Sequence, residues 1–260
     1  MSETDEYNLE SGPDPATVAT DHPEPREAAN PVHAVGIGPG STAYLTPRGK
    51  RSITEADVIV GFETVVEFMR DHIGDETTVF TCGYRDEATA LENFADRVAT
   101  GASGTAVLMG DPNHSGYQFV GKVQRVVDRP VRIIPGISAL QIAASRARTP
   151  MEATTFVTLH KSGEIDDALT RIRRDVGTRN LLILPRPFDW MPESIAAMLC
   201  EAGANPELET LVFERLTHEN ESRTQSTLGA LAADTAVAEP TREDTDFSDL
   251  SVLAIRQNTT

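Results

Sequence analysis

The stretch that decides the fold of this chain reads Val32-His33-Ala34-Val35-Gly36-Ile37-Gly38-Pro39-Gly40-Ser41. Its apolar first half predicts a short β-strand, and its second half predicts a tight turn into a helix. Glycines in such a turn permit close approach of the backbone to a ligand and leave N–H groups for an anionic group. We interpret the turn as one wall of an active site; a strand-to-helix turn without a ligand is the alternative.

Two well-known phosphate-binding loops do not fit this turn. The dinucleotide fingerprint G-x-G-x-x-G requires its third glycine where the chain has Ser41, and Pro39 removes a backbone donor. The Walker pattern requires glycine where the chain has Tyr44 and Ser or Thr where it has Arg51. The sequence therefore favours neither a dinucleotide fingerprint nor a P-loop.

Composition and charge limit the classes of function. With 260 residues, 39% of them hydrophobic, the chain is long enough for two domains of ordinary size. Its formal net charge of −17 argues against binding to nucleic acid, which depends on clustered Lys and Arg. Lysine occurs only at Lys50, Lys122 and Lys161, and this scarcity together with the acidic excess resembles haloarchaeal cytoplasmic proteins. An ordinary acidic protein is the alternative.

Cysteine content and hydropathy point to a cytoplasmic protein. Cys82 and Cys200 are far apart in the sequence, so neither a disulfide framework nor a protein-bound metal is expected, and both are expected to be buried or half-buried. No run of about twenty apolar residues occurs, and the N-terminus is acidic, so we expect no membrane contact.

Residues 1–30 differ from the rest of the chain. They are rich in Asp, Glu, Pro, Ser and Thr and show neither helical nor strand periodicity. Such a segment buries too little apolar surface to offset the entropy of ordering. We expect a disordered acidic tail.

From Val32 onward, apolar strands alternate with amphipathic helices, which is typical of an α/β layered fold. The strands expected first are Val32–Ile37, Asp57–Val60, Thr77–Phe80, Thr105–Met109 and Val131–Ile134. The helices expected between and after them are Pro47–Glu55, Phe62–Asp71, Glu87–Thr100, Gln118–Val127 and Ala139–Arg146. In a mainly parallel sheet the carboxyl ends of such strands share one edge, where α/β folds bind ligands.

A composition break at Pro150 predicts the domain boundary, giving an N-terminal domain at 31–149 and a C-terminal domain at 150–260. The second domain is expected to contain strands at Thr154–Leu159, Asn180–Leu184, Glu209–Phe213 and Leu250–Ile255. Its expected helices are Glu164–Asp175, Pro192–Glu201 and Leu228–Ala233, and the acidic stretch Glu239–Asp246 is expected to be a solvated loop.

Two further loops follow strands at the same sheet edge. Gly110–Tyr117 places the carboxylate of Asp111 directly after an apolar run, suited either to a ligand hydroxyl or cation or to simple turn formation. Pro135–Ala139 places Ser138 where it either caps a helix or contacts a ligand. Three loops converging on one edge favour a binding site.

The motifs, taken in order, resemble those of the tetrapyrrole methylases, the S-adenosylmethionine-dependent enzymes of corrin and sirohaem synthesis. They are Gly36-Ile37-Gly38-Pro39-Gly40, Tyr44-Leu45-Thr46, Ala56-Asp57-Val58-Ile59-Val60-Gly61, Gly110-Asp111-Pro112 and Pro135-Gly136-Ile137-Ser138. The resemblance covers about residues 32–257. It implies two α/β domains, the first sheet mainly parallel and the second mixed, with the active site in the interdomain cleft and usually a homodimer.

Within that family, four features look most like the branch that methylates C5 of cobalt-precorrin-7, the C5-methylating part of precorrin-6Y methylase. They are Leu159-His160, the strand Leu181–Leu184, Glu214-Arg215-Leu216-Thr217, and Glu221. The resemblance implies that a separate protein supplies the C15-methylating, decarboxylating activity.

The resemblance also implies site residues. S-adenosylmethionine would contact Pro39, Gly110, Asp111, His114, Ser138, Ala139 and Leu184. The tetrapyrrole would contact the first glycine loop at Gly36, Gly38 and Gly40. Tyr117 and His160 are further candidates for substrate binding, to orient the tetrapyrrole or its departing proton, and a purely structural role is the alternative for both. No catalytic residue is assigned, because a sulfonium methyl group is already electrophilic and the main task is alignment with an enamine-like carbon.

Two other functions fit the same resemblance. One is a methylase of the same fold acting on uroporphyrinogen III, another precorrin, or the modified histidine of a translation factor, as in diphthine synthase. The other is a non-catalytic binding protein, since a fold does not fix a function.

Overall fold

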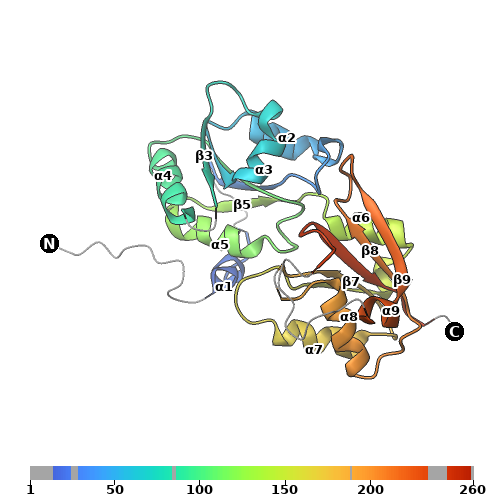
Figure 1. Ribbon diagram of the computed structural model, residues 1–260. Helices are drawn as coiled ribbons and strands as arrows, with labels where there is room; N and C mark the ends of the chain where they lie inside the picture. Colours follow the sequence, from blue (N-terminus) through green and yellow to red (C-terminus); the bar gives the residue numbers. More distant parts are fainter. Residues whose placement is uncertain (1–13, 25–28, 84–85, 188, 234–244, 259–260) are drawn as a thin grey trace. The chain divides into compact units, whose positions relative to one another are not determined.

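The structure of the chain, a computed structural model, describes residues 14–24, 29–83, 86–187, 189–233 and 245–258 (Figure 1). It divides into two compact units, Met1–Ile137 and Ser138–Thr260. The boundary predicted at Pro150 is wrong, because helix α6 (Ala139–Ala147) packs against strands of the second unit. Pro150 follows that helix closely, so the composition break marks a helix end.

The first unit is built on a five-stranded sheet in the order β3-β2-β4-β1-β5, and every pairing among these strands is parallel. The strands are β1 (Val32–Gly36), β2 (Val58–Phe62), β3 (Thr78–Cys82), β4 (Gly104–Leu108) and β5 (Val131–Ile134). Each begins within one residue of its predicted start, and the predicted parallel sheet is confirmed.

From Pro47 onward, the helices of the first unit also follow the sequence closely. They are α2 (Pro47–Thr54), α3 (Glu63–Phe68), α4 (Glu87–Ala99) and α5 (Tyr117–Val126). Thr46 caps α2, its Oγ1 accepting the Gly49 N–H at 3.1 Å. The predicted helix Phe62–Asp71 is divided, because a 3-10 turn at Arg70–His72 follows α3.

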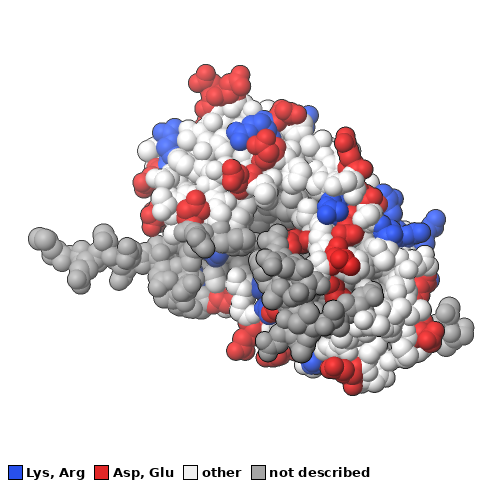
Figure 2. All heavy atoms as spheres, viewed as in Figure 1, with Lys and Arg blue, Asp and Glu red and all other residues white. Residues whose placement is uncertain are grey.

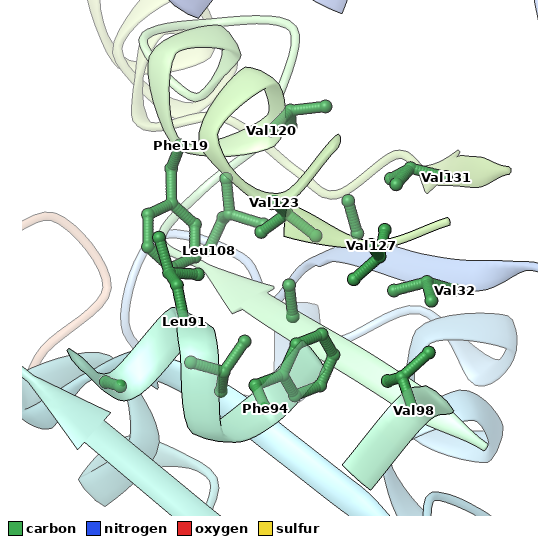
Figure 3. Packing of buried hydrophobic residues seen from close by; sticks show 14 of the residues in the cluster. Val32, Leu91, Phe94, Val98, Leu108, Phe119, Val120, Val123, Val127 and Val131 are labelled. Carbon is green, nitrogen blue, oxygen red and sulfur yellow. The ribbon is translucent and has the colours of Figure 1, made fainter. Parts of the chain in front are cut away.

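The alternation of side chains along β1 explains why helices cover both faces of this sheet. Val32 and Ala34 belong to one buried cluster, with residues of α4 and α5 such as Phe94 and Phe119 (Figure 3). Val35 belongs to a second cluster, with residues of α2 and α3. Successive strand residues point to opposite faces, so β1 buries apolar side chains on both.

The second unit has a mixed sheet in the order β6-β7-β10-β8-β9. Its strands are β6 (Thr154–Thr158), β7 (Asn180–Leu184), β8 (Glu209–Glu214), β9 (Ser222–Thr227) and β10 (Ser251–Ile255), and β6–β7 is its parallel pair. Its further helices are α7 (Asp166–Asp175), α8 (Pro192–Glu201) and α9 (Leu228–Ala233). The predicted loop Glu239–Asp246 lies mostly outside the described residues.

Strand β9 is absent from the sequence prediction. All six of its residues are polar, its first four are exposed, and β8 is its partner at the sheet edge. An edge strand that buries neither face shows no alternation of apolar and polar residues, so periodicity cannot detect it.

The predicted disordered tail is wrong for its described part. Residues 15–20 form helix α1 (Pro15–Thr20), whose first turn is capped by Asp14, and α1 packs against α5. Half-buried Ala19 reaches the cluster of Phe94 and Phe119. Residues 1–13 and 25–28 lie outside the described residues.

The surface carries the acidic excess of the sequence. Asp and Glu side chains are spread over the face shown in Figure 2. None of the described helices is long and apolar enough to cross a membrane.

As expected, Cys82 is buried and Cys200 is half-buried, and within the described residues both are free thiols.

Candidate functional site

Three loops meet at one edge of the first sheet. Strand β1 lies between β4 and β5, and all three run parallel. The residues that follow them, Gly36–Gly40, Gly110–Tyr117 and Pro135–Ser138, therefore leave the sheet side by side at its carboxyl edge. The predicted convergence of these loops is confirmed.

The first two loops are joined by backbone hydrogen bonds. The Gly38 N–H donates to the Gly110 carbonyl at 3.1 Å, and the Gly110 N–H donates to the Gly38 carbonyl at 2.8 Å. The Gly38 N–H is thus occupied by the protein and is not available to an anion, contrary to the expectation that this turn leaves its N–H groups to a ligand. The glycine turn serves first to fix the position of the loop after β4.

Contact between the loops is close enough to require glycine at two positions. A Cβ on residue 36 would lie 2.6 Å from the Gly110 carbonyl oxygen and 2.7 Å from the Gly136 nitrogen. A Cβ on residue 136 would lie 2.1 Å from the same oxygen. The three loops are therefore packed backbone to backbone, with no room for a side chain between them.

Asp111 stands at the start of the loop after β4 and is buried, with an exposed fraction of 9%. Its Oδ1 accepts the backbone N–H of Asn113 at 3.0 Å and the Asn113 Nδ2 at 2.7 Å. Its Oδ2 makes no hydrogen bond to the described residues. One carboxylate oxygen therefore shapes the loop, and the other can accept from a ligand hydroxyl or amino group.

Asn113 is a residue that the sequence analysis missed. It connects Asp111 to Tyr117, because its Oδ1 accepts the Tyr117 hydroxyl at 3.2 Å. The His114 N–H donates to the Asp111 carbonyl at 2.8 Å, which closes the turn. The signal was in the sequence, since Asp and Asn two residues apart favour a side-chain-closed turn.

Ser138 performs the helix-capping role that the sequence allowed. Its Oγ accepts the Leu140 N–H at 3.2 Å, and Gln141 Oε1 accepts the Ser138 N–H at 2.8 Å, a capping box at the start of α6. The hydroxyl can still donate one hydrogen bond to a ligand. Ala139 is the first residue of the helix and is partly exposed.

Leu184 and His160 lie together in the second unit, at the carboxyl ends of β7 and β6. The Leu159 N–H donates to the Leu184 carbonyl at 2.9 Å, which places His160 beside the end of β7. Burial lowers the pKa of His160, while the Asp249 charge and a hydrogen bond to the Pro185 backbone oppose that shift. His160 is therefore uncharged at neutral pH and can serve as a hydrogen-bonding group.

The loop between β8 and β9 is held in an unusual conformation. Arg215 and Thr217 have φ values of 49° and 71°, a left-handed region that a β-branched residue such as Thr217 rarely adopts. Glu221 holds this loop, because its Oε2 accepts the Thr217 N–H at 2.7 Å and its Oε1 lies 3.2 Å from the Arg146 Nε.

Within the described residues, no group of three or more His, Cys, Asp or Glu side chains could hold a metal ion.

Comparisons with known proteins agree with this architecture. The family model of the tetrapyrrole (corrin/porphyrin) methylases matches residues 31–232. The probable cobalt-precorrin-7 C(5)-methyltransferase of Methanocaldococcus jannaschii is 28% identical over 204 residues, which cover 77% of this chain and 91% of that relative.

Solved structures show the same fold. A cobalt-precorrin-4 methyltransferase matches with a TM-score of 0.67 at 16% identity, covering 86% of this chain and 94% of its own. The uroporphyrin-III C-methyltransferase of Thermus thermophilus, complexed with S-adenosylhomocysteine, matches with a TM-score of 0.63 at 18% identity. The match covers 87% of this chain and 92% of that structure's chain. The expected pair of α/β units, one with a parallel and one with a mixed sheet, is confirmed, and the chain belongs to the tetrapyrrole methylases as an S-adenosylmethionine-dependent methyltransferase.

Proposed function

We propose that this methyltransferase acts in cobalamin biosynthesis and methylates C5 of cobalt-precorrin-7. The observation that carries the proposal is the similarity to the relative from Methanocaldococcus jannaschii, which extends over 91% of that relative. The loop from Glu214 to Glu221, one of the stretches that resemble the C5 branch, supports it, because Arg215 and Thr217 have left-handed φ values there and Glu221 accepts the Thr217 N–H.

The methyl donor is proposed to bind at the carboxyl edge of the first sheet. The residues proposed to contact it are Pro39, Gly110, Asp111, His114, Ser138, Ala139 and Leu184. The geometry fits a donor that carries hydroxyl and amino groups, because Asp111, a largely buried residue, offers its second carboxylate oxygen and Ser138 a hydroxyl proton. The glycine contacts preorganise these groups before the donor arrives.

The chemistry requires alignment more than proton transfer. A carbon–carbon bond forms between the tetrapyrrole and the methyl group, the methyl–sulfur bond breaks, and a proton leaves the ring. Holding the two reactants in line can supply on the order of 7 kcal/mol of the barrier or more. Gly36, Gly38, Gly40, Tyr117 and His160 are proposed to line the tetrapyrrole side of the site, and no catalytic nucleophile is needed.

Partners follow from the same proposal. The chain is proposed to act as a homodimer. The acidic surface and the scarcity of lysine support a protein adapted to a salt-rich cytoplasm.

The proposal is tested by incubating the purified full chain with isotopically labelled S-adenosylmethionine and, in parallel, cobalt-precorrin-7, cobalt-precorrin-4 and uroporphyrinogen III. Mass spectrometry should show one added methyl group on cobalt-precorrin-7 alone, and NMR should place it on C5. Methylation of cobalt-precorrin-4 instead would favour the function of the structural neighbour. Absence of transfer to all three substrates by a chain that binds S-adenosylhomocysteine would leave a binding protein as the better interpretation.

A further inference from the structure

The N-terminal strap, defined as residues 14–24, is attached to the first unit at several places. Helix α1 packs against α5, and Figure 1 shows α1 directly below α5. The Gln118 Nε2 donates to the Asp14 Oδ1 at 3.3 Å, and Glu24 forms an ion pair with Arg132 on β5. A helix of six residues is not stable by itself, so these tertiary contacts hold it.

Gly121 is the position where the strap comes closest to α5. A Cβ on residue 121 would lie 1.7 Å from the Pro15 carbonyl oxygen and 2.5 Å from the Pro15 carbonyl carbon. Glycine in the interior of a helix is destabilising relative to alanine, so α5 by itself would be better served by alanine here. The close approach of the strap gives the physical reason for glycine at this position.

Helix α5 connects the strap to the ligand loop. Its first residue, Tyr117, donates its hydroxyl to Asn113 in the loop after β4, and the next residue, Gln118, contacts the strap. At the junction, the Gly116 N–H donates to the Pro112 carbonyl at 3.1 Å, and the two residues are packed so closely that a Cβ on residue 116 would lie 2.5 Å from the Pro112 Cα. A displacement of α5 is therefore transmitted to Asp111 and Asn113.

We propose that the N-terminal strap is a positioning element that clamps α5 and thereby holds the loop after β4 in its donor-binding geometry. It lies before residues 31–232, which match the methylase family, and so it is outside the matched region. The clamp itself rests on the contacts above; its effect on donor binding also rests on the proposed function.

The clamp is tested by introducing Gly121→Ala into two versions of the full chain and comparing the sign of the change in thermal midpoint. In the native chain, Gly121→Ala should lower the thermal midpoint, because the new methyl group displaces Pro15. In a chain carrying Ala19→Glu, which places a charge where the strap meets the core, Gly121→Ala should raise the midpoint through its better helix propensity. Thr17→Glu is the matched control, since Thr17 is on the exposed side of α1. A rise with Gly121→Ala in the native chain would overturn the clamp.

Donor binding is measured on the same variants by calorimetry with S-adenosylhomocysteine. Ala19→Glu should weaken binding by about fivefold or more, the range of a modest coupling between two sites, and Thr17→Glu should not. Glu24→Lys, which repels Arg132 from outside the core, is a second disruption should Ala19→Glu fail to fold. Unchanged affinity in both disrupted chains would overturn the positioning role. A native chain that binds no S-adenosylhomocysteine would instead contradict the proposed function, and the thermal comparison would still decide the clamp.

Discussion

The carbonyl oxygen of Gly110 lies 2.1 Å from the point that a Cβ on residue 136 would occupy. These residues follow β4 and β5, the two neighbours of β1, so their contact joins the loops on either side of the glycine turn. Both partners of this contact are backbone, and neither can move aside as a flexible side chain would.

Gly136→Ala should therefore destabilise the first unit by about 1–3 kcal/mol, the usual cost of overpacking a closely packed site. Gly83→Ala is the control, because a Cβ there would meet the Asp86 Oδ1 at an ordinary 3.5 Å. Thermal unfolding of both variants measures the difference. Equal midpoints would show that the loops have room to separate.

The ion pair of Glu87 and Lys122 joins α4 to α5 in the first unit. The Lys122 Nζ lies 2.6 Å from the Glu87 Oε2, and their side chains are 19% and 3% exposed. Lys122→Met should cost about 3–5 kcal/mol, because it leaves a buried carboxylate without a partner. Chemical denaturation should show that the double variant Lys122→Met with Glu87→Met recovers much of the unfolding free energy lost in Lys122→Met. A single variant as stable as the native chain would indicate that water replaces the lysine.

His160 predicts a pH dependence of stability. Burial holds its pKa in the folded chain below the ordinary value of 6.5, so the unfolded chain takes up this proton first as the pH falls. The contribution of neutral His160 is complete above about pH 6.5 and is lost as the pH falls toward the folded-state pKa. Relative to the native chain, His160→Asn should flatten the fall in unfolding free energy over this range, whereas His22→Asn, at an 86% exposed side chain, should not. Parallel curves of unfolding free energy against pH for all three proteins would show that buried His160 is not the cause of the pH dependence.

Surface charge predicts a response to salt. At a net charge of −17, self-repulsion is screened as salt rises from roughly tens of millimolar to molar, so the thermal midpoint should rise. Sucrose at matched osmolality is the control, because it favours compact states without screening charge. A midpoint that responds equally to both, or to neither, would argue against adaptation to salt.

Much of the fold could be predicted from the sequence because its strands are buried. β5 and β7 have the predicted bounds, since runs such as Val131–Ile134 end at clear turn residues. The edge strand β9 and helix α1 could not be predicted this way, because each is held by a neighbouring element and has no apolar periodicity of its own. The boundary at Ser138 depends on which sheet α6 packs against, and that is a long-range property.

The candidate site was partly predictable for a related reason. The glycine and aspartate positions are visible in the sequence because turns restrict residue type. The pairing of Gly38 with Gly110 was not visible, because it joins residues far apart in the chain, and it changes the role of the Gly38 N–H. The partnership of Asp111 with Asn113 was local and could have been recognised as a side-chain-closed turn.

The central claim is that the methyl donor binds at the loop edge of the first sheet through Asp111. Asp111→Asn keeps an acceptor for the Asn113 N–H and removes the charge, so it separates ligand binding from loop shape. Asp86→Ala is the control, since Asp86 also accepts a loop N–H, from Gly83, after another strand.

Calorimetry with S-adenosylhomocysteine on the folded full-length proteins is the most direct test. The account predicts one site per native chain, a loss of about 1–3 kcal/mol of binding free energy in Asp111→Asn, and no loss in Asp86→Ala. Native affinity in a folded Asp111→Asn chain would contradict it.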